Sequence, residues 1–285
     1  DCQKKYEYPN IIQASTGKNQ KEKIINAIKS LNGALRLSMS VQSMDQEVLE
    51  NIRRSNISVD QMLALAPAIE EEKLGTTAEV ILGLPGETYK SHIQTLRDLV
   101  KNNLNYVRPY TLMLLHGSEM NTPEQREKWQ FKTKFRILPK DFVKLSDGKK
   151  IIETEEVVIS TSTLNFEEYI DLRLLAFIMF VTNIGLVYDP LTRFLRERNI
   201  DVFDLFYNTL KQKDSAPKEV SQILEKFKQA TINELWDSPE DIEKNYQNDV
   251  EFNKLLNGEE GINVLQHYQA VLIFENLEEW TEYTL

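Results

Sequence analysis

Apolar and polar residues alternate in blocks along the first 115 residues, and this pattern predicts strands that alternate with amphipathic helices. Four apolar runs have the length of strands, and they lie at residues 11–15, 34–41, 77–82 and 105–115. Apolar residues also recur at the spacing of one helix face, at about residues 21–31, 45–54, 58–73 and 88–102. Such alternation is typical of right-handed βαβ units and a parallel sheet.

The third run is expected to be buried on both faces, and it ends in Gly83-Leu84-Pro85-Gly86-Glu87. Gly83 and Gly86 lack a Cβ, so the backbone can turn sharply or approach a ligand closely there. Open and closed α/β sheets bind ligands at the carboxyl ends of their strands. The turn therefore predicts either a ligand contact or a tight connection to the next helix without a ligand.

Beyond the fourth run the pattern changes. Residues 122–136 are polar, favour a helix and are rich in Lys and Arg. We expect a solvated helix face, with a surface for an anionic ligand or an acidic neighbouring domain as the alternative. Asp147-Gly148 is typical of a hairpin turn, and residues 151–163 are expected to form a strand. Only helices are predicted after that, at residues 166–183, 190–198, 202–213, 217–235, 239–248 and 262–282.

The predicted fold class is α/β, with the C-terminal half of a partial (β/α) TIM-like barrel, a small β insert and an all-helical region. The expected parts are residues 1–140, 141–163 and 164–285. The chain starts without Met, and its first residues are typical of the end of a helix. An apolar first strand would also leave a bare sheet edge. We therefore expect this chain to be a piece of a longer protein.

Composition excludes several classes of function. The net charge of −10 over 285 residues disfavours nucleic acid as a partner, because phosphate binding needs a basic surface. A single cysteine, Cys2, excludes an internal disulfide and a multi-cysteine metal site supplied by this chain alone. The most apolar stretch, residues 172–188, is short and contains Arg173, so we expect a buried helix and no membrane span. A cytoplasmic location is expected.

Candidate chemistry lies after the predicted strands. Gln42 ends an apolar strand, and it either satisfies backbone groups or binds a ligand, because a buried amide needs partners. Glu79 lies within the third strand, and Arg54 is a candidate partner for it or for a ligand carboxylate. Alternatively, Glu79 pairs with a neighbouring Lys or Arg and does no chemistry. His116 is a candidate acid/base or a turn residue. The three histidines have no metal-ligand spacing.

Three segments together resemble the radical S-adenosylmethionine (radical SAM) superfamily. They are SMSVQSMDQEVLENIRR at residues 38–54, EVILGLPGET at 79–88 and YTLMLLHGSEM at 110–120. They resemble, in order, the segment after the fourth barrel strand, the fifth strand with its turn, and the sixth strand with its loop. The run that includes CQKKYEYP, TGKN and KTKFRILP is most similar to the group with a B12-binding domain ahead of the radical SAM domain. The barrel resemblance covers about residues 1–140.

The resemblance implies a cofactor set. In such enzymes a CxxxCxxC motif holds a [4Fe–4S] cluster, whose open iron site binds SAM and cleaves it to a 5′-deoxyadenosyl radical. This chain has none of those cysteines, so the cluster ligands and a cobalamin domain are expected in upstream sequence. What the resemblance leaves in this chain is the other wall of the SAM site. The residues implied for it are Ser40, Gln42, Arg54, Glu79, Ile81, Gly83 and Met113.

Each implied residue has a role by the same resemblance. Gln42 and Arg54 would contact the ribose and the carboxylate of SAM, and Arg54 suits a carboxylate because its guanidinium is a planar fork of donors. Glu79 would face the ribose. Ile81 and the backbone near Gly83 would pack on adenine, with strand four near Met113 completing the pocket.

The resemblance implies the C-terminal part of a radical SAM enzyme, which generates a 5′-deoxyadenosyl radical or supports B12-dependent methyl transfer. This chain alone is expected to be inactive and to work with the missing N-terminal half of the same protein. The reaction and the substrate stay open. The alternatives are a non-catalytic interaction module that uses its helical region, or a barrel enzyme of unrelated chemistry that uses His116 and Glu119.

Overall fold

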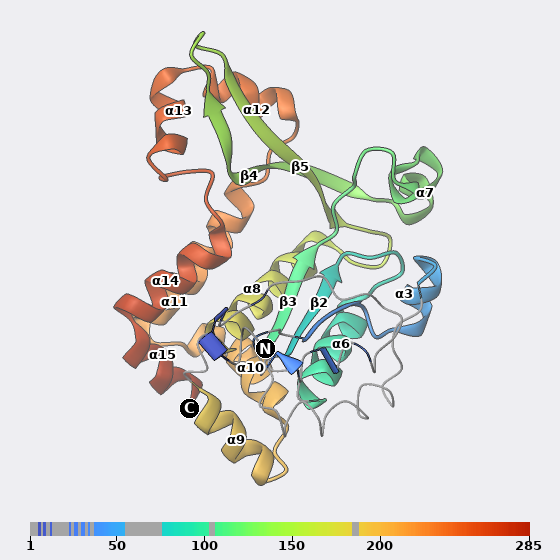
Figure 1. Ribbon diagram of the computed structural model, residues 1–285, viewed down its shortest axis with the longest axis vertical. Helices are drawn as coiled ribbons and strands as arrows, with labels where there is room; N and C mark the ends of the chain where they lie inside the picture. The colour runs from blue at the N-terminus through green and yellow to red at the C-terminus, as the bar shows by residue number, and fades with distance from the viewer. Residues whose placement is uncertain are drawn as a thin grey trace. The chain divides into compact units, whose positions relative to one another are not determined.

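Among the residues that the structure describes, the first sheet has three strands. The computed structural model describes, besides scattered single positions before residue 37, residues 37–54, 76–102, 106–183 and 188–285. The strand order is β1 (Leu37–Gln42), β2 (Thr76–Leu82), β3 (Tyr106–Thr111). Strands β1 and β2 pair in parallel, and β2 and β3 run the same way (Figure 1). The predicted α/β class with a parallel sheet is confirmed.

Two helices of this region were also predicted from the apolar spacing. Helix α3 (Gln46–Asn51) follows β1, and the side chain of Asp45 caps it by accepting from the Val48 N–H at 3.1 Å. Helix α6 (Tyr89–Lys101) follows β2. The predicted strand at 11–15 and the predicted helices at 21–31 and 58–73 lie largely outside the described residues.

Strand β2 differs from the expectation that both of its faces are buried. Ala78, Val80 and Leu82 are buried, whereas Glu79 and Ile81 on the opposite face are only half-buried. A strand with one polar position among apolar ones can leave that face partly open, because a carboxylate is costly to enclose. The half-open face of β2 is therefore the one that carries the predicted site residues.

The second sheet is an antiparallel hairpin of β4 (Lys132–Lys144) and β5 (Lys150–Ser160). Its turn contains Asp147 and Gly148, as predicted, and Gly148 has a φ of 87° that suits a residue without a Cβ. The prediction of a helix through residue 136 is wrong. Helix α7 (Pro123–Trp129) ends at Gln130 in the left-handed conformation, and β4 begins at Lys132.

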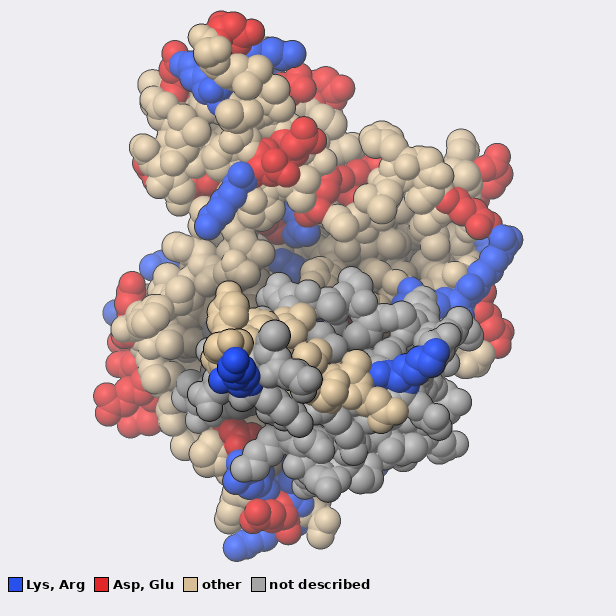
Figure 2. Space-filling model, in the orientation of Figure 1, with Lys and Arg blue, Asp and Glu red and all other residues tan. Residues whose placement is uncertain are grey.

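The basic stretch within residues 122–136 is compensated by carboxylates of the same chain. Three of its cations form ion pairs, which are Arg126–Glu156, Lys134–Asp237, Arg136–Glu155 and Arg136–Glu234. Figure 2 shows acidic and basic side chains interspersed over the hairpin and the neighbouring helices α12 and α13. The stretch is thus neither a helix throughout nor a purely solvated face.

Helices make up the rest of the chain, as predicted. Their bounds are α8 (Phe166–Asn183), α9 (Asp189–Glu197), α10 (Val202–Lys211), α11 (Lys218–Asn233), α12 (Pro239–Tyr246), α13 (Asp249–Leu256), α14 (Val264–Glu275) and α15 (Leu277–Thr284). Sequence reasoning missed α13 and joined α14 to α15. In the described parts of the chain, no helix has the length and apolar character that crossing a membrane requires.

The chain divides into two compact units that interleave along the sequence. One comprises residues 1–81, 90–110 and 182–203 and contains most of the three-stranded sheet; the other comprises residues 82–89, 111–181 and 204–285. In the second unit, Phe177 of α8 stacks on Phe227 of α11 with ring centroids 4.4 Å apart. A separate apolar cluster joins β4 to helices α12 and α13, with Ile137, Ile242, Tyr246, Phe252 and Leu255 at its centre.

Candidate functional site

Ser40 connects two of the predicted site residues at the end of β1. The register of the parallel pair sets Ser40 opposite Glu79, and the Ser40 hydroxyl donates to Glu79 Oε2 at 2.7 Å. Arg54 reaches the same residue from the segment after α3, where its Nη2 donates to the Ser40 carbonyl oxygen. Three residues that lie far apart in the sequence therefore meet at one end of the sheet.

Arg54 has a hydrogen-bond donor that no acceptor among the described residues uses. Its Nε is buried and has no hydrogen-bond partner among the described residues, and burial lowers the pKa of Arg54 from its ordinary value. Its Nη2 donates to a neutral carbonyl oxygen, while Glu79 accepts from a hydroxyl. A partly buried guanidinium with an unused N–H donor favours binding of a further hydrogen-bond acceptor. A carboxylate suits it, because its two oxygens match the planar set of guanidinium donors.

Gln42 lies at an irregular point of β1. It has a φ of 65°, and the pairing with β2 shifts between Ser40 and Gln42. A residue with a side chain is uncommon in this conformation and costs about 1 kcal/mol there. Within the described residues, the Gln42 amide makes no hydrogen bond. The role of Gln42 in ligand binding stays a prediction.

The glycine turn after β2 is held by a carboxylate that sequence reasoning did not single out. Glu87 is 1% exposed, and its Oε2 accepts from the Gly83 N–H at 2.7 Å. The Glu87 carbonyl oxygen accepts from the Thr163 hydroxyl at 2.6 Å. Gly83 and Gly86 both have positive φ, at 91° and 80°. The turn is thus preorganised, and a Glu four residues after the first glycine was the signal available for it.

Gly83 also lies against β5. A Cβ at this position would come 3.6 Å from the Val158 carbonyl oxygen and 3.7 Å from its Cγ1. The Gly83 N–H is already bonded to Glu87. Any ligand contact made by Gly83 therefore uses its Cα and carbonyl group.

Met113 and His116 lie outside the three-stranded sheet. The predicted strand 105–115 ends at Thr111, and the chain then pairs with β5 through a bridge between Met113 and Val157. Met113 is 38% exposed, and His116 is exposed as well. Among the described residues His116 makes no hydrogen bond, and its acid/base role stays a prediction.

Among the residues that the structure describes, no three side chains of His, Cys, Asp or Glu gather as a ligand set for a metal ion. The chemistry that the described site residues offer is hydrogen bonding to a polar ligand by Ser40, Gln42, Arg54 and Glu79.

Comparisons with known proteins bear on the resemblance. No protein-family model matches the chain. The chain is 27% identical over 209 residues to a 2-(S-pantetheinyl)-carbapenam-3-carboxylate methyltransferase of Streptantibioticus cattleyicolor, which covers 72% of this chain. It is 28% identical over 209 residues to the cobalamin-dependent radical SAM methyltransferase TokK of Streptomyces tokunonensis, which covers 71% of it. An uncharacterised protein of Methanocaldococcus jannaschii is 28% identical over 102 residues, or 36% of this chain.

These matches cover 30% of the length of each relative, so the chain spans less than a third of the proteins that it resembles. One of the two longer matches is a cobalamin-dependent radical SAM methyltransferase, and the other is also a methyltransferase. These matches confirm the resemblance drawn from the sequence, to the radical SAM group that includes cobalamin-dependent methyltransferases.

Proposed function

We propose that this chain is the C-terminal part of a radical SAM enzyme that supports B12-dependent methyl transfer, and that it supplies one wall of the SAM site. The contact of Ser40 with both Glu79 and Arg54 carries this proposal. It joins three of the implied SAM-binding residues on the half-open face of the sheet. Two relatives are methyltransferases, and this supports the reaction class.

The proposed fold of the complete domain is a partial (β/α) barrel. The three parallel strands would form part of its C-terminal half, and sequence outside this chain would supply the remaining strands. In α/β barrels the strand ends at the carboxyl side carry the ligand contacts. Ser40 and Gln42 lie within the last three residues of β1, and Gly83 follows β2, so they are near the positions at which such contacts are made.

The side chains fit SAM by their hydrogen-bonding chemistry. The unused donors of Arg54 suit the SAM carboxylate, since a guanidinium binds a carboxylate through two parallel hydrogen bonds. The Glu79 carboxylate accepts from the Ser40 hydroxyl and retains lone pairs for ribose hydroxyls. Ile81 lies on the same face of β2 and offers an apolar surface to adenine.

The remaining cofactors would not be held by this chain. A [4Fe–4S] cluster needs several cysteine thiolates, and the chain has only Cys2, so its residues do not fit a cluster. In the complete protein the cluster would supply the electron that cleaves SAM, and cobalamin would carry the methyl group. This chain's own residues orient SAM and shield its adenosyl end from water.

Arg54 provides the test in the full-length protein. Arg54→Ala should raise the Kd for SAM about 10- to 100-fold, because a hydrogen bond to a charged group contributes about 1.5–3 kcal/mol. Gln42→Ala should also weaken binding. Arg53→Ala, a change at the exposed neighbour, serves as the control and should leave the Kd unchanged. Equilibrium dialysis with labelled SAM measures all three, and an unchanged affinity in Arg54→Ala would refute the assignment.

A further inference from the structure

A second arginine is buried without the partners that an arginine needs. Arg173 lies on α8 and is 7% exposed. Its closest carboxylate oxygen is Glu234 Oε1, which is 4.0 Å from Nη2 and too far for a hydrogen bond. Its Nε is sealed from solvent and has no acceptor. In the described parts of the chain, the guanidinium of Arg173 makes no hydrogen bond.

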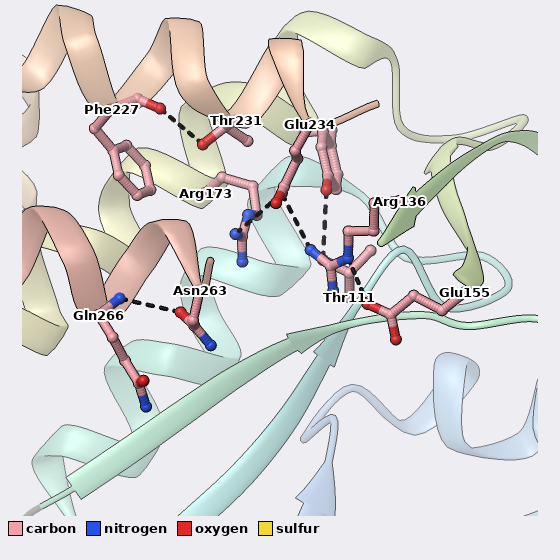
Figure 3. Close-up of polar contacts among 10 residues, drawn as sticks. Thr111, Arg136, Glu155, Arg173, Phe227, Thr231, Glu234, Asn263 and Gln266 are labelled. Carbon is pink, nitrogen blue, oxygen red and sulfur yellow. Dashed lines mark hydrogen bonds and ion pairs between the residues drawn. The ribbon is translucent and has the colours of Figure 1, made fainter. Parts of the chain in front are cut away.

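The neighbouring Arg136 donates to the carboxylates that could otherwise accept hydrogen bonds from Arg173. Arg136 of β4 donates to Glu155 of β5, and its Nη1 donates to Glu234 Oε1 at 3.2 Å (Figure 3). Burial alone would lower the pKa of Arg136, but the charges of Glu234 and Glu155 outweigh burial and raise it. Glu234, at the end of α11, is therefore committed to Arg136 and offers Arg173 only a distant charge.

The positive and negative charges of this cluster are equal in number, but one of its arginines lacks hydrogen-bond acceptors. Arg136, Arg173, Glu155 and Glu234 carry two positive and two negative charges. A guanidinium presents five N–H donors and no acceptor, so Arg173 lacks acceptors. Figure 3 shows the Arg173 guanidinium directed away from the Arg136–Glu155 pair, on the side where Asn263 lies. Burial of such a charged group is unfavourable unless its N–H donors are bonded to acceptors.

We infer that Arg173 binds an oxyanion, a carboxylate or a phosphate group, through its terminal nitrogens. Nη1 and Nη2 form the end of a planar fork that matches two oxygens of such a group. Of the three guanidinium nitrogens, only Nε is sealed from solvent. The small exposed fraction of Arg173 restricts the ligand to a small anion or to one anionic group of a larger molecule.

Arginine side-chain NMR tests the site directly. The chain labelled with ¹⁵N-arginine is titrated with sodium acetate and, separately, sodium phosphate, with sodium chloride keeping the ionic strength constant. The Nε–H signal that disappears in Arg173→Lys should move saturably with at least one of the two anions. A preference for acetate assigns a carboxylate group, and a preference for phosphate assigns a phosphate group.

Variants separate binding from folding. Arg173→Gln should raise the Kd for the preferred anion about 10-fold or more, as expected for loss of a charge-assisted bidentate contact. Arg193→Gln removes an exposed arginine on α9 and should not change the Kd. If Arg173→Gln does not fold, the wild-type titration still decides. A signal of Arg173 that fails to saturate with either anion overturns the proposal. The experiment needs neither SAM nor a cluster, so its outcome is independent of the proposed function.

Discussion

At the scale of residues, three carboxylates differ in what they accept. Glu79 accepts from the Ser40 hydroxyl, Glu87 from the Gly83 N–H, and Glu156 from Arg126 and Thr133. Glu79 was recognisable in the sequence because a lone carboxylate stands out in an apolar strand. Glu87 and Glu156 were not, because their donors are set by turns and strand pairing.

Glu156 makes stability depend on pH. Burial would raise its pKa, but the hydrogen bonds from Arg126 and Thr133 and the charge of Arg126 lower it. The folded-state pKa is therefore below the unfolded value of about 4.3. The stabilisation is complete above that value and is lost as the pH falls through the folded-state pKa. Glu156→Gln should lower Tm by a few degrees at pH 7 and by less at pH 3, because part of the stabilisation is lost below the unfolded-state pKa.

Thermal unfolding followed by circular dichroism at both pH values checks this expectation. Glu153→Gln, at an exposed position of the same strand, is the control and should change Tm little at either pH. A loss of Tm in Glu156→Gln that is equal at pH 7 and pH 3 would show that its carboxylate charge does not stabilise the fold.

At the scale of elements, local pattern and long-range pairing disagree at one place. The polar segment after Thr122 favours a helix, and α7 does form there, with the Thr122 side chain accepting from the Gln125 N–H. Beyond Gln130 the chain is a strand, since Phe135 exchanges backbone hydrogen bonds with Trp236 and β4 pairs with β5. Tertiary pairing outweighs an intrinsic helix preference, which amounts to less than about 1 kcal/mol per residue.

Two glycines beside the apolar cluster that joins β4 to α13 allow the cost of backbone strain to be distinguished from the cost of overpacking. Gly258 and Gly261 both have left-handed φ values, of 74° and 63°. A Cβ at Gly261 would lie 2.8 Å from Phe142 Cε1 and 2.9 Å from Leu255 Cδ2, whereas a Cβ at Gly258 has nothing within 4 Å. Gly261→Ala should therefore cost about 1–3 kcal/mol more than Gly258→Ala, as overpacking does.

Urea unfolding of the two variants measures this difference, because the backbone cost is shared and cancels between them. The difference should appear in the transition midpoint at an unchanged m value. Equal destabilisation by Gly261→Ala and Gly258→Ala would mean that Phe142 and Leu255 move aside without cost.

At the scale of the whole molecule, the chain consists of two units that interleave along the sequence. It spans less than a third of each relative. The proposed activity thus depends on sequence outside this chain.

Iron–sulfur reconstitution tests this dependence. After anaerobic incubation with iron and sulfide, this chain should hold no stable [4Fe–4S] cluster and should not cleave SAM, because Cys2 alone cannot replace the several thiolates that such a cluster uses. The full-length protein, treated in parallel, should show both cluster absorbance and SAM cleavage. Cluster absorbance with SAM cleavage by this chain alone would contradict the proposal.

The sequence by itself determined the features that depend on neighbouring residues. Apolar spacing predicted the parallel α/β region and most of the C-terminal helices, because one turn or one strand already defines which face is buried. Three motif segments indicated the resemblance to the radical SAM superfamily, because their order and spacing are read along the chain. Only the tertiary structure decided the start of β4, the closure of the glycine turn by Glu87 and the cluster around Arg173. Arg136 and Glu234 are 98 residues apart, and no local pattern relates residues at that separation.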